Sequence, residues 1–155
     1  MKKSILLIML TGTSLVSPQN NTTQICNFTG PSDLAVQCLS FFQVTAESTK
    51  AARCRNSGII RVNITFNRDI GFTSDIAVPV TVNGPNGFSS STPGIIPGQI
   101  QFKKGDSIPF EIPVPSGGSY TVTTNINAAG PCTFTCTNIL VKQISCFPLI
   151  YCCAR

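Results

Sequence analysis

The chain has 155 residues, of which only 11% are charged, and its formal net charge is +5. This length predicts a single domain, and its lysine and arginine residues form no basic stripe that could follow a phosphate backbone, so we expect no nucleic-acid partner. The chain lacks histidine, which excludes Ser-His and Cys-His catalytic dyads and removes the commonest metal ligand.

The acidic residues give no sign of a catalytic pair. A glycosidase needs two carboxylates placed across a sugar, and the sequence singles out no such pair among its six acids. Asp69, Asp75 and Asp106 lie in turn-like stretches, where a carboxylate usually accepts hydrogen bonds from the local backbone. We therefore expect a protein that is not an enzyme and that takes no cofactor, metal ion or small-molecule ligand.

Residues 1–24 are expected to form either a secretory signal peptide or a retained, flexible N-terminal arm. Lys2 and Lys3 precede an apolar run, Ile5–Leu10, as they would in a signal peptide. Because a bilayer takes about 20 apolar residues to cross, this run is too short to span it, and we expect no membrane partner in the mature form. A retained arm could instead add a strand to the next subunit. The inserted side chains would be Ile5, Leu7 and Met9, or the alternate set Leu6, Ile8 and Leu10.

Alternating apolar residues predict short β-strands throughout residues 25–148, which we take as the folded domain. The predicted strands cover residues 60–66, 76–82, 100–102, 108–114, 120–126, 132–141 and 144–146. Pro79 predicts that strand 76–82 lies at a sheet edge or carries a bulge, because proline donates no hydrogen bond to a ladder. Pro109, Pro113 and Pro115 predict an edge position for strand 108–114 by the same reasoning.

The segment Leu34–Thr49 is less regular, and we interpret residues 36–44 within it as a further strand. No segment has a helical stripe of apolar residues. Roughly eight short strands separated by turn sequences are typical of an all-β sandwich or jelly roll. The predicted organisation is thus an arm (residues 1–24), a sandwich domain (25–148) and a short cysteine-bearing tail (149–155).

Eight cysteines without a CxxC motif favour disulfides, and hence an oxidising compartment, over a metal site. Cys132 and Cys136 are four residues apart on a predicted strand, so their Cα atoms should be ~13 Å apart and their side chains should face the same way. A disulfide needs Cα atoms within about 7 Å. These two cysteines therefore need separate partners.

Two adjacent cysteines, Cys152 and Cys153, lie in the tail. Successive side chains of an extended chain point to opposite sides, which favours two different partners. The tail is then either a covalent clamp between subunits or part of a fully internal set of four disulfides. Because a sandwich of this size can fold without four disulfides, we favour at least some bonding between subunits.

Three motifs carry a resemblance to a known family. Ile150-Tyr151-Cys152-Cys153 joins an apolar residue to a double cysteine, eleven residues separate Cys26 from Cys38, and residues 112–119 contain a Pro-Ser-Gly-Gly-Ser turn. These motifs resemble those of endospore-appendage fibre subunits, which are small jelly-roll proteins of spore-forming bacteria. In that family the double cysteine lies in an N-terminal connector and bonds to strand cysteines of other subunits, whereas here it lies at the C-terminal end.

The resemblance implies a homopolymer whose copies are linked by disulfides on the outside of a cell or spore. Cys152 and Cys153 would be the donors. Cys38 and Cys146 would be acceptors by analogy with the first-strand and last-strand positions of the family, and strand geometry allows Cys132 and Cys136 equally. Cys26 and Cys54 remain for other disulfides.

Two functions follow from these observations. The first is a structural subunit of an extracellular, pilus-like filament or appendage that assembles through disulfides between subunits and strand addition by the arm. The alternative is a monomeric secreted binding module, adhesin-like or lectin-like, with ligand loops at residues 83–92 or 116–119. Asn27 and Asn63 stand in N-glycosylation sequons, and Asn63 is expected on the solvent-facing side of its strand.

Overall fold

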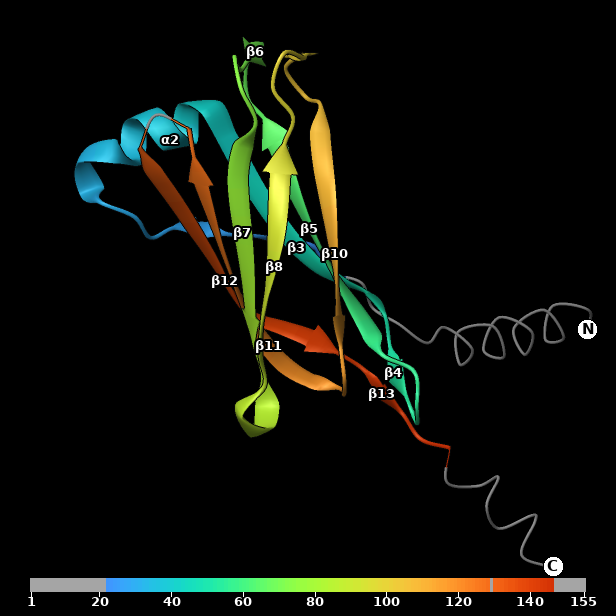
Figure 1. The fold of residues 1–155 in the computed structure, drawn as a ribbon. Coiled ribbons are helices and arrows are strands. Elements are labelled where there is room, and N and C mark those ends of the chain that lie inside the picture. The colour runs from blue at the N-terminus through green and yellow to red at the C-terminus, as the bar shows by residue number, and fades with distance from the viewer. Residues whose placement is uncertain (1–21, 129, 147–155) are drawn as a thin grey trace, which may run out of the picture.

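Two antiparallel sheets pack face to face in the computed structural model of the chain, which describes residues 22–128 and 130–146 (Figure 1). The first sheet has the order β1 (Gln24–Ile25), β3 (Phe42–Lys50), β5 (Gly58–Phe66) and β10 (Ser107–Val114). The second has the order β2 (Asn27–Phe28), β12 (Pro131–Val141), β11 (Gly118–Asn127), β7 (Ile76–Asn83) and β8 (Ser89–Ile96). The predicted all-β sandwich is therefore confirmed.

Seven of the strands in the described residues are eight to eleven residues long, close to the eight expected, and six more have two residues each. Four of these short strands form two small sheets. One pairs β6 (Ile70–Gly71) with β9 (Gln101–Phe102), and the other pairs β4 (Ala52–Arg53) with β13 (Gln143–Ile144). The strands β6 and β4 lie at opposite ends of the sandwich (Figure 1).

The core follows from the period-two pattern of the sequence. On β5, Ile60, Val62 and Ile64 are 0% exposed, while the residues between them are half-buried on the outer face. The strands β7 and β11 repeat this alternation against the same core. Each aliphatic or aromatic side chain removed from water in this way stabilises the fold by about 1.5–3 kcal/mol.

The proline positions separate an edge strand from an interior one. β10 lies at the edge of the first sheet, as its prolines predict. The expectation of an edge or bulge at Pro79 is wrong, because β7 lies between β11 and β8 with Pro79 in register with Pro93. Pairing of β7 with β11 begins only at Val80, so the missing N–H of Pro79 costs no hydrogen bond on that side.

The sequence predicts a ligand loop over residues 83–92, but residues 89–92 of that range form the first half of strand β8. The actual turn is shorter, a 3-10 turn η2 (Pro85–Gly87), and Ser89 begins the returning strand. β8 gives no alternating signal, because it is an edge strand in which only Gly94 and Ile96 are buried. The second expected loop, residues 116–119, is also shorter than predicted: residues 115–117 form the turn from β10 into β11, and β11 begins at Gly118.

Residues 36–44 are not one strand. A 3-10 turn η1 (Ser32–Leu34) leads into the helix α2 (Ala35–Phe41), and β3 begins only at Phe42. Seven residues make about two helical turns, too few to produce a recognisable apolar stripe. Pro31 and Asp33, just ahead of the helix, are typical of a helix start and argue against a strand over residues 36–44.

Candidate functional site

Three disulfides pair six cysteines of the described residues with one another. The pairs are Cys26–Cys136, Cys38–Cys132 and Cys54–Cys146, with Cα–Cα distances of 4.4, 5.5 and 5.9 Å. Cys132 and Cys136 are both buried on one face of β12, and they bond to different partners, as their spacing predicts.

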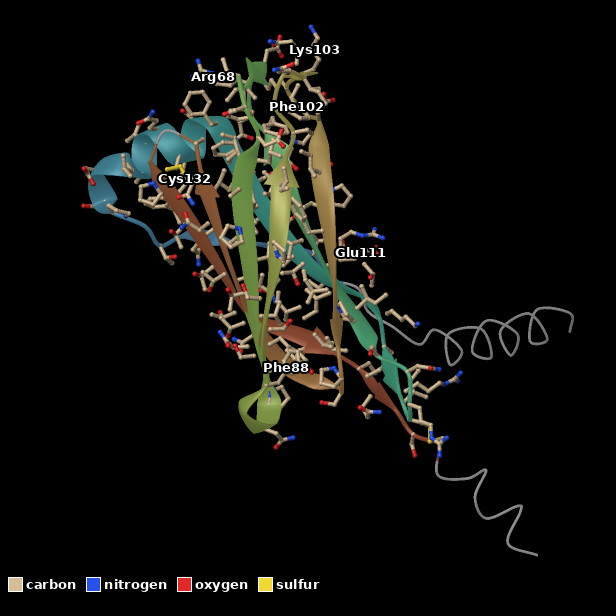
Figure 2. The ribbon with its side chains drawn as sticks, viewed as in Figure 1. Arg68, Phe88, Phe102, Lys103, Glu111 and Cys132 are labelled. Atoms are coloured by element: carbon tan, nitrogen blue, oxygen red, sulfur yellow. A yellow bond between two sulfur atoms is a disulfide. The ribbon has the colours of Figure 1, made fainter. Side chains whose placement is uncertain are left out.

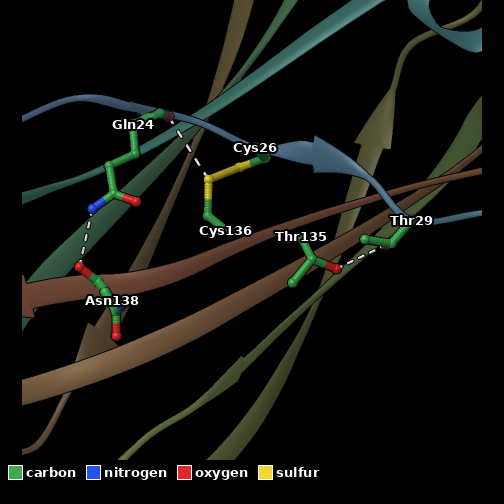
Figure 3. Close-up of a disulfide and its surroundings, with 6 residues drawn as sticks. All are labelled: Gln24, Cys26, Thr29, Thr135, Cys136 and Asn138. Carbon is green, nitrogen blue, oxygen red and sulfur yellow. Dashed lines mark hydrogen bonds between the residues drawn. A yellow bond between two sulfur atoms is a disulfide. The ribbon is translucent and has the colours of Figure 1, made fainter.

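The Cys26–Cys136 disulfide fixes the place where the chain enters the fold (Figure 3). Cys26 lies between β1, which pairs with β3 of the first sheet, and β2, which pairs with β12 of the second. The entering chain thus crosses from one sheet to the other. On either side of the disulfide, the Gln24 side-chain amide donates to the carbonyl of Asn138 at 3.0 Å, and the hydroxyls of Thr29 and Thr135 are 2.9 Å apart.

The other two disulfides lie at opposite ends of the sandwich. Cys38–Cys132 ties α2 to the beginning of β12 and is buried, with exposed fractions of 1% and 4%. Cys54–Cys146 ties the turn after β4 to the chain just beyond β13, and Cys54 is exposed. Cys146 is also the last residue that the structure describes. Whatever follows it begins from a covalently fixed point.

The four expected acceptors, Cys38, Cys132, Cys136 and Cys146, are all bonded within the chain. This corrects the expectation that they stand free to bond another copy, because the fold brings each of them next to a cysteine from a distant part of the same chain. Cys26 and Cys54 are their partners. The expected donors, Cys152 and Cys153, lie outside the described residues, as do Ile5, Leu7 and Met9 of the arm.

An apolar cleft that no sequence motif predicts opens beside α2. We call it the α2 cleft, and its volume is about 180 Å³. The cleft is lined by residues of α2, the start of β3, β6 and its neighbour Phe72, the turn after β11, and the start of β12. These residues are Gln37, Cys38, Phe41, Phe42, Ile70, Phe72, Ala128 and Cys132. Figure 2 labels Cys132 beneath α2, with Arg68 at the same end of the sandwich.

The size and lining of the α2 cleft limit what it can bind. Pockets for drug-sized ligands or cofactors usually measure ~300–1,000 Å³, so the α2 cleft is too small for one. Gln37 is the one residue with a polar side chain among its lining residues. At its rim, the guanidinium carbon of Arg68 lies 5.0 Å from the centre of the Phe41 ring. One or two apolar side chains are the natural occupants of such a space.

Four acidic side chains stabilise the fold through backbone hydrogen bonds or an ion pair. As predicted for the turn residues, Asp75, Asp69 and Asp106 accept backbone hydrogen bonds at 2.8 Å, from the N–H groups of Gly98, Lys104 and Lys103 respectively. Glu111 forms an ion pair with Arg61 at 2.6 Å on the outer face of the first sheet. Within residues 22–128 and 130–146, no group of three or more His, Cys, Asp or Glu residues is placed to hold a metal ion.

The two sequon asparagines both lie on strands. Asn27 on β2 is exposed, and Asn63 on β5 is half-buried on the outer face, where the alternation of the strand predicts it. Glycosylation of either residue stays a prediction.

Comparison of the chain with protein-family models and with curated proteins finds no match. Three disulfides within a β-sandwich are typical of a disulfide-stabilised protein that folds in an oxidising compartment outside the cytoplasm. In the part of the chain that the structure describes, no helix combines the length and the apolar character needed to cross a membrane.

Proposed function

We propose that this protein is a structural subunit of an extracellular filament or appendage, and that Cys152 and Cys153 of the tail form covalent bonds between copies. One observation carries the proposal. The chain has eight cysteines, and six of them are paired with each other in the fold, which leaves two, both in the tail. A tail that begins at the fixed Cys146 and carries two remaining thiols is suited to reach a neighbouring copy.

The sulfur that a tail thiol bonds to in the neighbouring copy can come from two sources. Two tail thiols can be oxidised to a disulfide by a small-molecule disulfide of the oxidising compartment, which takes up two electrons and two protons and leaves as two thiols. Alternatively, a tail thiolate can attack one of the folded disulfides and release its other sulfur as a thiolate. Both routes join two copies, and both depend on Cys152 or Cys153.

Strand addition by a retained arm would strengthen the same assembly. β8 lies at the edge of the second sheet, and its first four residues, Ser89–Thr92, contain no proline, so each of them has a backbone N–H. The edge strand β10 carries Pro109 and Pro113 and is the poorer acceptor. We therefore propose β8 as the edge at which Ile5, Leu7 and Met9 would be inserted.

The proposed role is not enzymatic. The turn carboxylates and Glu111 are already engaged in hydrogen bonds or an ion pair, and the α2 cleft contains no acidic residue. The partner is a second copy of the same chain.

Gel electrophoresis with and without reductant tests the function. The wild-type protein should form a ladder of covalent multimers that collapses to a monomer band when a reductant is added. The Cys152→Ser/Cys153→Ser variant should run as a monomer in both lanes, whereas Cys54→Ser/Cys146→Ser retains the tail thiols and serves as the matched control. A wild-type monomer band in both lanes would favour the alternative, a monomeric secreted binding module.

A further inference from the structure

We propose that the α2 cleft binds the apolar residues 147–151 of a second copy, so that copies stack end to end. These residues, Phe147-Pro148-Leu149-Ile150-Tyr151, connect the last folded cysteine to the double cysteine, and we call them the FPLIY segment. The inference rests on the proposed self-assembly, but it concerns non-covalent docking and involves no tail cysteine.

The chemistry of the cleft matches that of the segment. Three phenylalanines, an isoleucine, an alanine and a disulfide make up most of the lining, and the volume of about 180 Å³ suits one or two aliphatic side chains. Leu149 and Ile150 are two such side chains next to each other in the sequence. Close to the cleft, Val36 and Leu39 on α2 are 84% and 49% exposed. They enlarge the apolar surface that an incoming segment could cover.

The FPLIY segment cannot reach the α2 cleft of its own chain. Cys132 lines the cleft, and Val141 lies nine residues further along β12, which places it roughly 30 Å away. Beyond Val141 the chain continues through β13 to Cys146, at the end of the sandwich opposite α2 (Figure 1). From Cys146, even a fully extended chain brings Tyr151 no further than about 18 Å.

The apolar segment and the cleft that fits it therefore start from opposite ends of the molecule. When a patch at one end binds a different patch at the other end of the next copy, the contact is heterologous and each added copy presents the same free cleft again. Such contacts produce an open filament unless the rotation between copies closes a ring. The docking would therefore set the orientation in which each copy is added to the filament. The tail thiols would then link neighbouring copies covalently.

The N-terminal apolar run is the competing occupant, but the structure constrains it less. Leu10 is twelve residues before Thr22, the first described residue, so an extended arm could span about 40 Å and reach clefts of its own or another copy. The arm therefore gives no preference between a closed monomer and an assembly. The short distance available to the FPLIY segment requires a second copy.

Sedimentation velocity tests the docking without the covalent bonds. All proteins carry Cys152→Ser/Cys153→Ser, and the parent should self-associate in a concentration-dependent way. Two cleft variants, Ile70→Asp and Ala128→Phe, introduce a charge or fill the space, and one segment variant, Leu149→Asp/Ile150→Asp, removes the occupant. Each should weaken self-association at least tenfold. The control Leu140→Asp changes a leucine that is 72% exposed on β12, outside the cleft and away from the β8 edge, and should stay within twofold of the parent.

A mixing experiment tests the direction of the contact. The Ile70→Asp protein retains its FPLIY segment, and the Leu149→Asp/Ile150→Asp protein retains its cleft, so an equimolar mixture should form heterodimers that do not grow further. A parent that stays monomeric, a mixture that forms no heterodimer, or an equal loss in the Leu140→Asp control would overturn the docking. Association that is lost on deleting residues 5–10 but not in the segment variant would assign the cleft to the arm instead.

The two proposals fail separately. A redox-sensitive ladder without tail docking would leave the covalent function standing and remove this inference. Docking without a ladder would do the reverse.

Discussion

Thr124 on β11 is 0% exposed, and its hydroxyl oxygen has no hydrogen-bond partner among the described residues. A buried hydroxyl without a partner costs about 1–3 kcal/mol relative to one that stays in water. Thr124 therefore occupies a position in the apolar core that suits a methyl group better than a hydroxyl.

Replacement of Thr124 by valine should raise the free energy of unfolding by about 1 kcal/mol, because the side chain keeps its shape and loses the unsatisfied oxygen. Urea denaturation of the two proteins measures the difference. Thr123→Val is the matched control, since Thr123 is half-buried on the opposite face of the same strand, and it should change stability much less. A loss of stability in Thr124→Val would mean that the hydroxyl has a partner.

At the scale of the elements, the disulfides differ in burial far more than in the length of chain that they close. The sequence separations are 110, 94 and 92 residues, so the entropic gain from closing each loop is similar, about 4–5 kcal/mol in the chain-entropy model. Cys26 and Cys136 are 4% and 2% exposed and belong to the core, whereas Cys54 is exposed. The buried pair therefore contributes packing as well as a cross-link.

Removal of the buried pair in Cys26→Ala/Cys136→Ala should lower the free energy of unfolding more than removal of the less buried pair in Cys54→Ala/Cys146→Ala. The expected excess is about 1–3 kcal/mol, because two sulfurs leave a space in the core and the crossing between β1 and β2 loses its anchor. Thermal unfolding under non-reducing conditions checks this. Equal losses would show that the cross-link alone sets the stability.

The long strands could be predicted from the sequence because their inward residues alternate without interruption, as Ile60, Val62 and Ile64 do. The edge strand β8 could not be predicted in this way, because its first four residues are serine and threonine and few of its side chains reach the core. The helix α2 could not be predicted, because Cys38 is the one buried side chain among its seven residues and a single position forms no apolar stripe. Cys38 lies in this helix, and the helix places it next to Cys132.

The candidate site was less predictable than the fold. Sequence spacing shows that Cys132 and Cys136 need different partners, but the choice of partner depends on which distant segments the two sheets bring together. The α2 cleft depends on the same long-range packing, since Phe41, Ile70 and Ala128 come from three separate parts of the chain. A sequence pattern read along one strand or helix carries no signal for such a surface.

The whole molecule has two distinct ends. One end carries α2, the buried Cys38–Cys132 pair and the apolar cleft. The other end carries β4, β13 and the Cys54–Cys146 pair, in which Cys54 is exposed and after which the tail continues. A sandwich with different surfaces at its two ends is suited to assembly in a row. We propose that the tail thiols join one copy to another along such a row.

Non-reducing peptide mapping of protein assembled from an equal mixture of ¹⁵N-labelled and unlabelled chains tests that claim most directly. The account predicts that disulfide-linked peptides containing Cys152 or Cys153 include mixed pairs, with one labelled and one unlabelled partner, and that the Cys26–Cys136 peptide contains no mixed pairs. Tail peptides that are always of one isotope, or tail cysteines recovered as free thiols, would contradict it.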